Sequence, residues 1–242
     1  MTLLESRLLD FSLSLPHPVN FKEPDTGRYI FSNKQSANQV GVTSPEQMLG
    51  LTVRDLNFSC SNTNWGRALA GKIERMDHMA KQDKVKVEDT AVFLKPDGRL
   101  IFESVTKIPI LSPRNQVTGI ATINQDFTYR LTHRLLYEQY THLCGRKQAP
   151  QKLLQHLGLE TWFCTFPTHT ELKVLLDRAM GYSDKAIAHR HNVSKRTIET
   201  HLVHLRSKLR GNTLPQIIES MPCSVAIPVH ETSVRDTEKR RP

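Results

Sequence analysis

Apolar residues follow a helical spacing most clearly near the C-terminal end of the chain. They recur at intervals of four, three and four residues, at Ile198, Leu202, Leu205 and Leu209. This spacing predicts a helix from about Lys195 to Leu209 with one buried stripe. Because a helix turns by about 100° per residue, its opposite side carries Arg196, Thr200, Val203 and Ser207, flanked by Glu199 and Arg210.

Two shorter helices are expected before this one. All three begin at a hydroxyl residue that can accept a hydrogen bond from a free backbone amide: Thr168, Ser183 and Ser194. Glu171 completes a capping box with Thr168, and Gly181 ends the first helix. Asn192 tolerates the left-handed conformation of the turn before the third helix, and we expect Val193 to fill the angle between the helices.

Residues 1–130 mix short helical and strand patterns. One helix is expected in residues 1–15 and a longer one from Trp65 to about Lys81, with a strand–turn–strand unit at 21–31 between them. Three strands are expected at 84–94, 99–111 and 116–127. The middle strand places Leu100, Phe102, Ser104, Thr106 and Ile108 on one face. Antiparallel strands preceded by small helices indicate an α+β domain.

A helical spacing returns between residues 127 and 160. Leu136, Tyr140 and Leu143 lie at i, i+4 and i+7. The pattern breaks from Gly145 to Pro150 and resumes over residues 151–157. We therefore expect a connection built of helices. The last twelve residues, from Glu231, contain one apolar residue, which predicts a disordered tail.

The positive charge of the chain is concentrated in one part. The net charge is +9, and residues 165–212 carry nine Lys and Arg against four Asp and Glu, whereas residues 1–130 carry 16 against 14. Such a distribution suits a polyanion such as DNA. No apolar run reaches the roughly 18 residues of a membrane span, and the N-terminus lacks a secretion signal. We therefore expect a cytoplasmic protein with no membrane partner.

Short helices with a tight turn before the third are typical of a helix-turn-helix, whose third helix enters the major groove of DNA. Base contacts are therefore expected from Arg196, Glu199, Thr200 and Val203, because these side chains can bond guanine or cytosine or touch a thymine methyl. Contacts to the DNA backbone are expected from Ser194, Lys195, Thr197, Lys185, Arg206 and Lys208. The alternative is a basic helical module that binds a protein partner instead of DNA.

Three motifs in this region resemble the LuxR-type helix-turn-helix without a gap through Leu209. They are Thr168-x-x-Glu171-x-x-Val174-Leu175, Gly181-Tyr-Ser183-Asp-Lys185-Ala-Ile187-Ala188 and Val193-Ser194-Lys-Arg-Thr197-Ile198-Glu-Thr200-His201. The resemblance implies four helices, the last at residues 214–221, and dimer binding to a two-fold DNA site. It implies base contacts at Glu199, Thr200 and Val203.

The sequence departs from that family in two places. Pro167-Thr168 and Thr170 stand where members usually carry Leu-Thr and Arg. Glu199 stands where members often carry Lys, and its carboxylate weakens non-specific attraction to DNA. The operator sequence therefore cannot be taken from the relatives.

The N-terminal part resembles a PAS domain. Its motifs are Asp25-x-Gly27-Arg-Tyr-Ile-Phe-x-Asn33, Leu49-Gly50-Leu-Thr-x-x-Asp55-Leu56, Asp97-Gly98-Arg99 and Gly119-Ile-Ala-Thr-Ile-Asn-Gln-Asp126-Phe127-Thr128. The resemblance implies a five-stranded antiparallel sheet with helices on one face and a sensory or dimerising role. It also implies that a signal leaves through the helix beginning near Asp126. Leu136, Tyr140 and Leu143 would then form a dimer seam; the alternative is packing within one chain.

The expected organisation has five parts: an N-terminal helix (1–16), a PAS-like sensory domain (17–130), a helical linker and dimer seam (131–164), a LuxR-type helix-turn-helix domain (165–222) and a disordered tail (223–242). We expect a bacterial transcription regulator rather than an enzyme. We also expect the chain to form a homodimer that binds double-stranded DNA and RNA polymerase. One alternative replaces the PAS domain with an acyl-homoserine-lactone receptor domain, although two Trp and five Tyr are few for its pocket. Another, a sensor kinase with His133 as phosphoacceptor, lacks a Gly-rich phosphate loop.

No cofactor and no metal are expected. The four cysteines form no Cys-x-x-Cys pair, and Cys60 lacks the Asn-Cys-Arg context of a flavin photosensor. His78 is the one candidate haem ligand. The histidines of the helix-turn-helix (His189, His191, His201 and His204) lie close in sequence, but we find no Cys or carboxylate to complete a ligand set.

Overall fold

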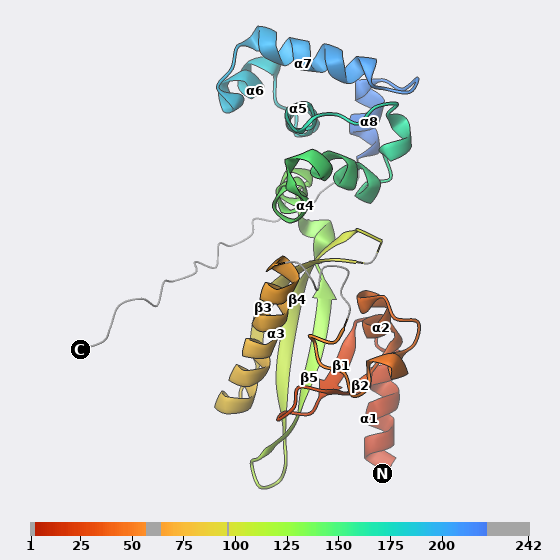
Figure 1. Cartoon of the computed structure of the whole chain (residues 1–242), viewed down its shortest axis with the longest axis vertical. Helices are drawn as coiled ribbons and strands as arrows, with labels where there is room; N and C mark the ends of the chain where they lie inside the picture. The colour runs from red at the N-terminus through yellow and green to blue at the C-terminus, as the bar shows by residue number, and fades with distance from the viewer. Residues whose placement is uncertain (1–2, 57–63, 96, 222–242) are drawn as a thin grey trace, which may run out of the picture.

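A computed structural model describes residues 3–56, 64–95 and 97–221, and it contains a sheet domain and a helical domain joined by a bent helix (Figure 1). The predicted disordered tail, Cys60 and Pro96 lie outside the described residues. None of the helices in the described part of the chain is long and apolar enough to cross a membrane.

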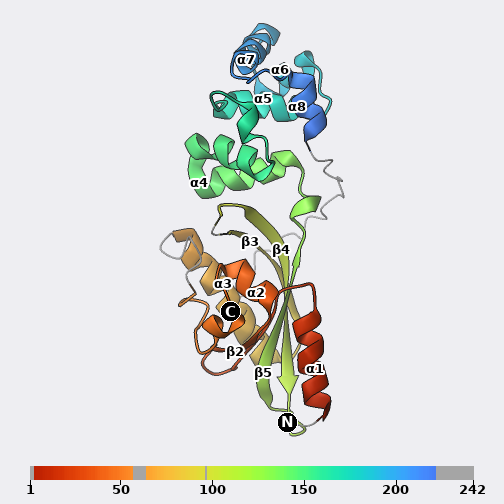
Figure 2. The same cartoon turned by 90° about the vertical axis from the view of Figure 1, so that its right-hand side faces the viewer.

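The N-terminal domain is built on a five-stranded antiparallel sheet with the order β2-β1-β5-β4-β3. The strands are β1 (Val19–Lys22), β2 (Tyr29–Ser32), β3 (Val87–Leu94), β4 (Leu100–Leu111) and β5 (Val117–Asp126). The helices are α1 (Leu3–Ser14), α2 (Lys34–Val40), η1 (Pro45–Met48) and α3 (Asn64–Asp83). Figure 2 shows α2 and α3 on the same side of the sheet, and α3 contacts β3, β4 and β5. The predicted α+β architecture is confirmed.

The covered face of β4 is not the one that the sequence pattern emphasised. Its buried side chains are Ile101, Glu103, Val105 and Lys107, whereas Phe102, Ser104 and Thr106 are half-buried and Ile108 is exposed. Leu100 is buried because the hairpin end of the strand packs against the linker helix. The alternation of side chains along β4 was predicted correctly. Because two charged residues lie on the covered face, hydrophobicity alone did not identify which face is covered.

The linker helix α4 (His133–His156) bends at Gly145, whose φ of 75° is left-handed. Pro150 lies inside the second segment, so the interruption is shorter than the predicted break from Gly145 to Pro150. A short helix η2 (Thr128–Arg130) precedes α4, and η3 (Glu160–Trp162) follows it. Figure 1 shows α4 between the sheet and the remaining helices.

The C-terminal domain contains α5 (His169–Ala179), α6 (Asp184–His191), α7 (Lys195–Ser207) and α8 (Leu214–Ser220). Thr168, Ser183 and Ser194 each accept a hydrogen bond from the backbone amide three residues ahead, and the Thr168–Glu171 capping box is complete. Asn192 adopts the predicted left-handed conformation, with φ of 53°. Val193 does not fill the angle between the helices, because 41% of it is exposed.

One apolar core runs from the β3–β4 hairpin through α4 into the C-terminal domain. Leu136 and Tyr140 are 3% and 0% exposed within the single chain, and Leu143 packs against the same core. For Leu136 and Tyr140 the alternative of packing within one chain therefore holds, because their side chains are buried inside one chain. Ile198, Leu202 and Leu205 belong to this core as predicted. Leu209 lies beyond the end of α7, where it pairs with Phe163.

Candidate nucleic-acid interface and sensory cavity

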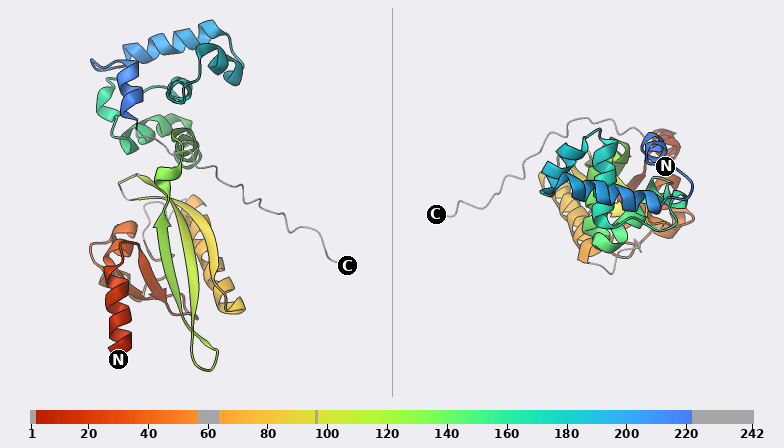
Figure 3. Two further views of the ribbon diagram at one scale, coloured as in Figure 1. Left: turned by 180° about the vertical axis from the view of Figure 1, so that it is seen from behind. Right: turned by 90° about the horizontal axis from the view of Figure 1, so that it is seen from above.

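Helix α7 lies at the end of the molecule farthest from the sheet, and no other described element covers its outer side (Figure 1; Figure 3, right). All four residues predicted to contact bases are exposed: Arg196, Glu199, Thr200 and Val203. Val203 is 57% exposed although it is apolar. The structure therefore brings the predicted set together on one accessible face.

The side chains on this face are arranged for apolar as well as polar contacts. The Thr200 hydroxyl donates to the backbone oxygen of Arg196 at 3.0 Å. This hydrogen bond occupies the hydroxyl within the helix and leaves the methyl group of Thr200 available beside Val203. A thymine methyl is the base feature that such a surface can contact.

Glu199 is paired with Lys195, whose Nζ lies 3.1 Å from its Oε1. Both side chains are at least half exposed, so this ion pair contributes little to stability. It does offset the negative charge of Glu199 at the surface. If Lys195 turns to a phosphate, the carboxylate of Glu199 becomes free to accept a hydrogen bond from cytosine.

The residues predicted to contact the DNA backbone fall into two groups. Ser194, Lys195 and Thr197 lie at the start of α7, where the Ser194 hydroxyl accepts from the Thr197 amide at 3.1 Å. That hydroxyl caps the helix, so the first amides of α7 and the Lys195 side chain are what remains for a phosphate. Lys185 on α6 and Arg206 on α7 are exposed.

Lys208 is not placed as predicted. Its Nζ lies 2.6 Å from Oε2 of Glu171, and only 20% of its side chain is exposed. Burial raises the pKa of Glu171, but hydrogen bonds from Lys208 and from the Thr168 amide lower it below its ordinary value overall. Lys208 therefore serves to tie the end of α7 to the start of α5, and we leave it out of the DNA contacts.

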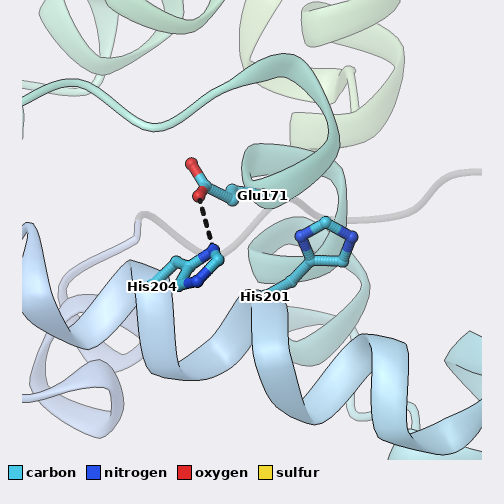
Figure 4. Close-up of side chains that lie close together, drawn as sticks. All are labelled: Glu171, His201 and His204. Atoms are coloured by element: carbon cyan, nitrogen blue, oxygen red, sulfur yellow. Dashed lines mark ion pairs between the residues drawn. The ribbon is translucent and has the colours of Figure 1, made fainter.

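Glu171 also changes the picture of the histidines. Figure 4 shows that its carboxylate lies beside His201 and His204, with Oε1 3.8 Å from Nδ1 of His204. One ligand atom from each of the three residues lies within 4.8 Å of the others, so a carboxylate does complete the set that the sequence left incomplete. Lys208 and the Thr168 amide already satisfy the other carboxylate oxygen. The expectation of no metal stays a prediction.

Sequence reasoning missed a second buried carboxylate, Asp177 on α5, which is fully buried. Its oxygens lie 2.6 Å from Arg134 of α4 and 2.6 Å from His191 at the end of α6, with Arg190 at 3.7 Å. Asp177 therefore joins the linker helix to the turn that precedes α7. The sequence signal was a carboxylate directly after the apolar pair Leu175-Leu176, inside the buried run of α5.

The sheet domain contains a buried ionic cluster that the sequence did not indicate. Lys22 on β1 and Lys107 on β4 both place Nζ 2.7 Å from the carboxylate of Asp77 on α3. Both lysine side chains are 1% exposed. Burial, followed by the charge of Lys22, lowers the pKa of Lys107 to about 8. Burial raises the pKa of Asp77, but the two lysines together hold it below its ordinary value.

Beside this cluster lies a cavity of about 50 Å³ between the sheet and the helices α2 and α3. Polar side chains on its wall include Asn20, Tyr29, Gln39, Glu103, Lys107 and Asn124. Gln39 and Asn124 donate to the two oxygens of Glu103 at 2.6 and 3.0 Å. Burial nevertheless raises the pKa of Glu103 to about 8. The side-chain oxygens of Asn20 and Asn124 are buried without a hydrogen-bond partner, so the cavity presents acceptors to any donor that enters.

Among the described residues, no candidate for a cofactor ligand lines this cavity. His78, the candidate haem ligand, is exposed on α3. Cys60 lies outside the described residues. Phe102 is half-buried on the opposite face of β4 and does not line the cavity.

The sheet is connected to α4 by hydrogen bonds around its exit strand. Asp126 accepts from the Thr128 amide at 2.7 Å, and the Thr128 hydroxyl accepts from the Phe102 amide at 2.8 Å. Further along, the buried Tyr140 hydroxyl accepts from the Leu100 amide at 2.8 Å and lies 2.9 Å from Nδ1 of His156. Tyr140 therefore connects β4 to both segments of α4, to the second through His156.

A polar cavity under an antiparallel sheet, followed by a helix-turn-helix with an exposed third helix, defines the class of sensor domains joined to DNA-binding domains. Comparison with known families agrees with the architecture. The model of the luxR family of bacterial regulatory proteins matches residues 168–221, and a PAS fold model matches residues 14–132. The chain therefore carries a PAS fold followed by a LuxR-type helix-turn-helix domain. The luxR family is one of regulatory proteins.

Among curated proteins, the oxygen regulatory protein NreC of two Staphylococcus epidermidis strains is 25% identical over 122 residues. The match covers 50% of this chain and 50% of NreC. The chain therefore matches about half the length of these curated relatives.

Among solved structures, Vibrio cholera VqmA in complex with ligand and DNA is 20% identical, with a TM-score of 0.48 over 91% of this chain and 86% of VqmA. The phage VqmA–DPO complex is 22% identical, with a TM-score of 0.49 over 90% and 87% of the two chains. The PAS domain of Bordetella pertussis BvgS is 17% identical, with a TM-score of 0.44 over 59% and 98%. At these scores the overlaps are partial and identify nothing that this chain binds.

Proposed function

We propose that this chain is a sequence-specific DNA-binding transcription regulator whose α7 helix contacts bases in the major groove under the control of its PAS domain. The observation that carries the proposal is the exposed face of α7, made by Arg196, Glu199, Thr200 and Val203, on a helix whose other face is fully buried. A helix of this size fits the major groove, and its side chains match base edges.

Binding to the DNA backbone is assigned to the cations and amides around this face. They belong to Ser194, Lys195, Thr197, Lys185 and Arg206. Such contacts position the protein without specifying sequence. The chain would act as a homodimer on a two-fold site, and its dimer surface has to lie outside Leu136 and Tyr140, which are buried in one chain. Contact with RNA polymerase stays a prediction.

The PAS cavity supports a sensory role for the N-terminal domain. Two unpaired asparagine oxygens and Glu103 line a space of about 50 Å³. A small polar molecule that donates hydrogen bonds would satisfy these groups, and an unsatisfied buried acceptor is costly. Because β4 carries Glu103 and also contacts α4, occupancy of the cavity can alter the position of the linker helix.

The first experiment is selection of binding sites from genomic DNA with the purified full-length chain, beside Thr200→Ala and Val203→Ala. Each variant should relax base preference at one or two positions by about 1–3 kcal/mol per lost contact. Thr170→Ala, an exposed threonine on α5, is the matched control. Unchanged preference in both α7 variants would show that this face does not contact bases.

The salt dependence of binding separates DNA recognition from the alternative of a protein-interaction module. Each phosphate contact contributes about 0.9 to the slope of log K against log salt concentration. Lys195→Gln and Lys185→Gln should each reduce the slope by about that amount, whereas Lys208→Gln should not. Binding that is insensitive to salt would favour a protein partner.

A further inference from the structure

A second cavity, of about 210 Å³, lies between the linker helix α4 and helix α5 of the DNA-binding domain. Its polar wall is formed by Arg134, Tyr137, Thr141, Arg146, His169 and Lys173. Figures 1 and 2 both show α5 between α4 and α7, so this cavity lies on the far side of α5 from the proposed DNA-binding face. It is also separate from the cavity under the PAS sheet.

The cavity has an excess of positive charge that the protein does not neutralise. Arg134 is engaged by Asp177 at 2.6 Å and by Glu138 at 3.3 Å. In the part of the chain that the structure describes, Arg146 and Lys173 have no ion-pair partner. Glu138 is the one carboxylate on the cavity wall. Two cations, one on each helix, therefore line the space without an ion pair of their own, because Glu138 is paired with Arg134.

His169 lines the same cavity as the two cations. Burial, then the charges of Lys173 and Arg146, lower the pKa of His169 below its ordinary value. The two cations come from separate helices, yet both disfavour a positive charge on the same imidazole. An anion between them would have the opposite effect on that ring.

The hydrogen-bonding groups of the cavity favour an anionic ligand as well. The buried Tyr137 hydroxyl lies 2.8 Å from Nδ1 of His169. When Tyr137 donates to Nδ1, the neutral ring carries its proton on Nε2 and can donate from that side. The Arg146 guanidinium and the Lys173 ammonium are donors only. In that tautomer His169, Arg146 and Lys173 each offer a donor among the residues that line the cavity, whereas the Thr141 hydroxyl already donates to the Tyr137 backbone oxygen at 2.9 Å.

We propose that the cavity between α4 and α5 is a binding site for a small phosphate anion, inorganic or as a monoester, held by Arg146, Lys173 and His169. A phosphate monoester carries roughly 1.5–2 negative charges at neutral pH, which suits the two unpaired cations. The arginine fork and the lysine point charge are the groups that proteins commonly use for phosphate. The bound anion links the two helices through which the PAS domain reaches the DNA-binding domain.

The ligand adds to two existing contacts between the same helices, Arg134 with Asp177 and Tyr137 with His169. Phosphate bound there restrains α4 against α5 and makes the joint stiffer. The site thereby gives the DNA-binding domain an input that does not pass through the PAS cavity. This inference stands apart from the proposed function, because neither Arg146 nor Lys173 is among the proposed DNA contacts.

Calorimetric titration of the full-length chain tests the site, with inorganic phosphate and glycerol phosphate as separate probes and chloride used to hold the ionic strength constant. The wild type should bind at least one probe, and Lys173→Gln and Arg146→Gln should each weaken binding by about tenfold or more. Lys147→Gln is the matched control, because Lys147 is exposed next to Arg146 but does not line the cavity. Binding of inorganic phosphate indicates a free anion, and binding of glycerol phosphate alone indicates an esterified one.

A second readout is the NMR titration of the His169 imidazole. Bound phosphate should raise its pKa in the wild type, and Lys173→Gln should need about tenfold more phosphate for the same rise. The proposal is overturned if neither probe binds, if Lys147→Gln weakens binding as much as Lys173→Gln, or if the His169 titration does not respond to phosphate. DNA binding of the same variants, measured without phosphate, should match the wild type, so failure here is distinguishable from failure of the proposed function.

Discussion

Asp77 in the PAS domain is 12% exposed and Asp177 in the DNA-binding domain is fully buried, and both carboxylates are held by cations that differ in their access to water. Lys22 and Lys107 are each 1% exposed around Asp77, whereas Arg134 and Arg190 are 29% and 36% exposed around Asp177. A buried cation without its partner must be desolvated or neutralised, while an arginine at the surface returns to water. The same ion-pair chemistry is therefore far more demanding in the sheet domain.

The difference also bears on function. Lys107 of the Asp77 cluster lines the PAS cavity, so this cluster fixes a charge on the wall that the proposed ligand would contact. The Asp177 cluster joins three helices of which one, α4, belongs to the linker. The Arg134–Asp177 ion pair can be replaced by water, which suits a contact between helices that change position. The buried lysine–Asp77 ion pairs suit a rigid part of the fold.

The largest effect is expected from Asp77→Asn, which removes the partner of both buried lysines. The free energy of unfolding should fall by about 3–5 kcal/mol, the usual result of breaking a buried pair from one side. Urea denaturation of the full-length chain measures it. Glu74→Gln, which breaks the exposed pair with Arg54 on the same helix α3, should cost under about 1 kcal/mol. Equal losses for the two variants would contradict the assigned burial.

The next effect is the pH dependence produced by Glu103. Its pKa is raised to about 8 in the folded chain from an ordinary value of 4.5. Between these two pH values the folded state keeps the proton on Glu103, whereas the unfolded state has released it. Stability should therefore fall as the pH rises from about 4.5 to about 8. In the wild type the free energy of unfolding should fall by on the order of 3 kcal/mol over this pH range, and Glu103→Gln should abolish that fall.

Denaturation of wild type and Glu103→Gln at pH 5 and pH 7.5 is the appropriate measurement. Keeping below pH 8 avoids the opposite contribution of Lys107, whose lowered pKa favours the folded state as the pH rises from about 8 toward 10.5. Parallel pH profiles of the two proteins would mean that Glu103 is ionised in the fold.

Asp177→Asn should destabilise the chain by less than Asp77→Asn, by about 1–3 kcal/mol. The asparagine keeps one acceptor, and Arg134 and Arg190 remain partly in water. The same variant should loosen α4 from α5, which hydrogen exchange in the two helices can detect. A loss as large as that of Asp77→Asn would refute the distinction between the two clusters.

The smallest effect is expected from Thr168→Ala, which removes the side chain that accepts from the Glu171 amide at the start of α5. Loss of an N-cap costs about 1 kcal/mol. Glu171 should stay in place because Lys208 still binds it at 2.6 Å. Thermal unfolding is sensitive enough for this change, and Thr170→Ala on the exposed side of the same helix provides the baseline. A cost well above that of an N-cap would indicate that Thr168 does more than cap α5.

Local sequence was sufficient for most of the DNA-binding domain. The caps at Thr168, Ser183 and Ser194 involve hydrogen bonds over three residues, so the residues that make them are adjacent in sequence. The stripe of Ile198, Leu202 and Leu205 likewise defined the buried side of α7 and hence its exposed side. Val193 and Lys208 were misplaced because their surroundings come from other helices. The base contacts themselves stay a prediction.

The sequence by itself determined the order of strands and helices, the turn at Asn192 and the face of α7 that points outward, because each depends on spacing within a few residues. Tertiary structure alone decided which face of β4 is covered, since its inner charges, Glu103 and Lys107, are balanced by groups on other elements. It also decided that Leu136 and Tyr140 pack within one chain. Long-range ion pairs and shared cores depend on which elements the topology places side by side, and no local spacing records that.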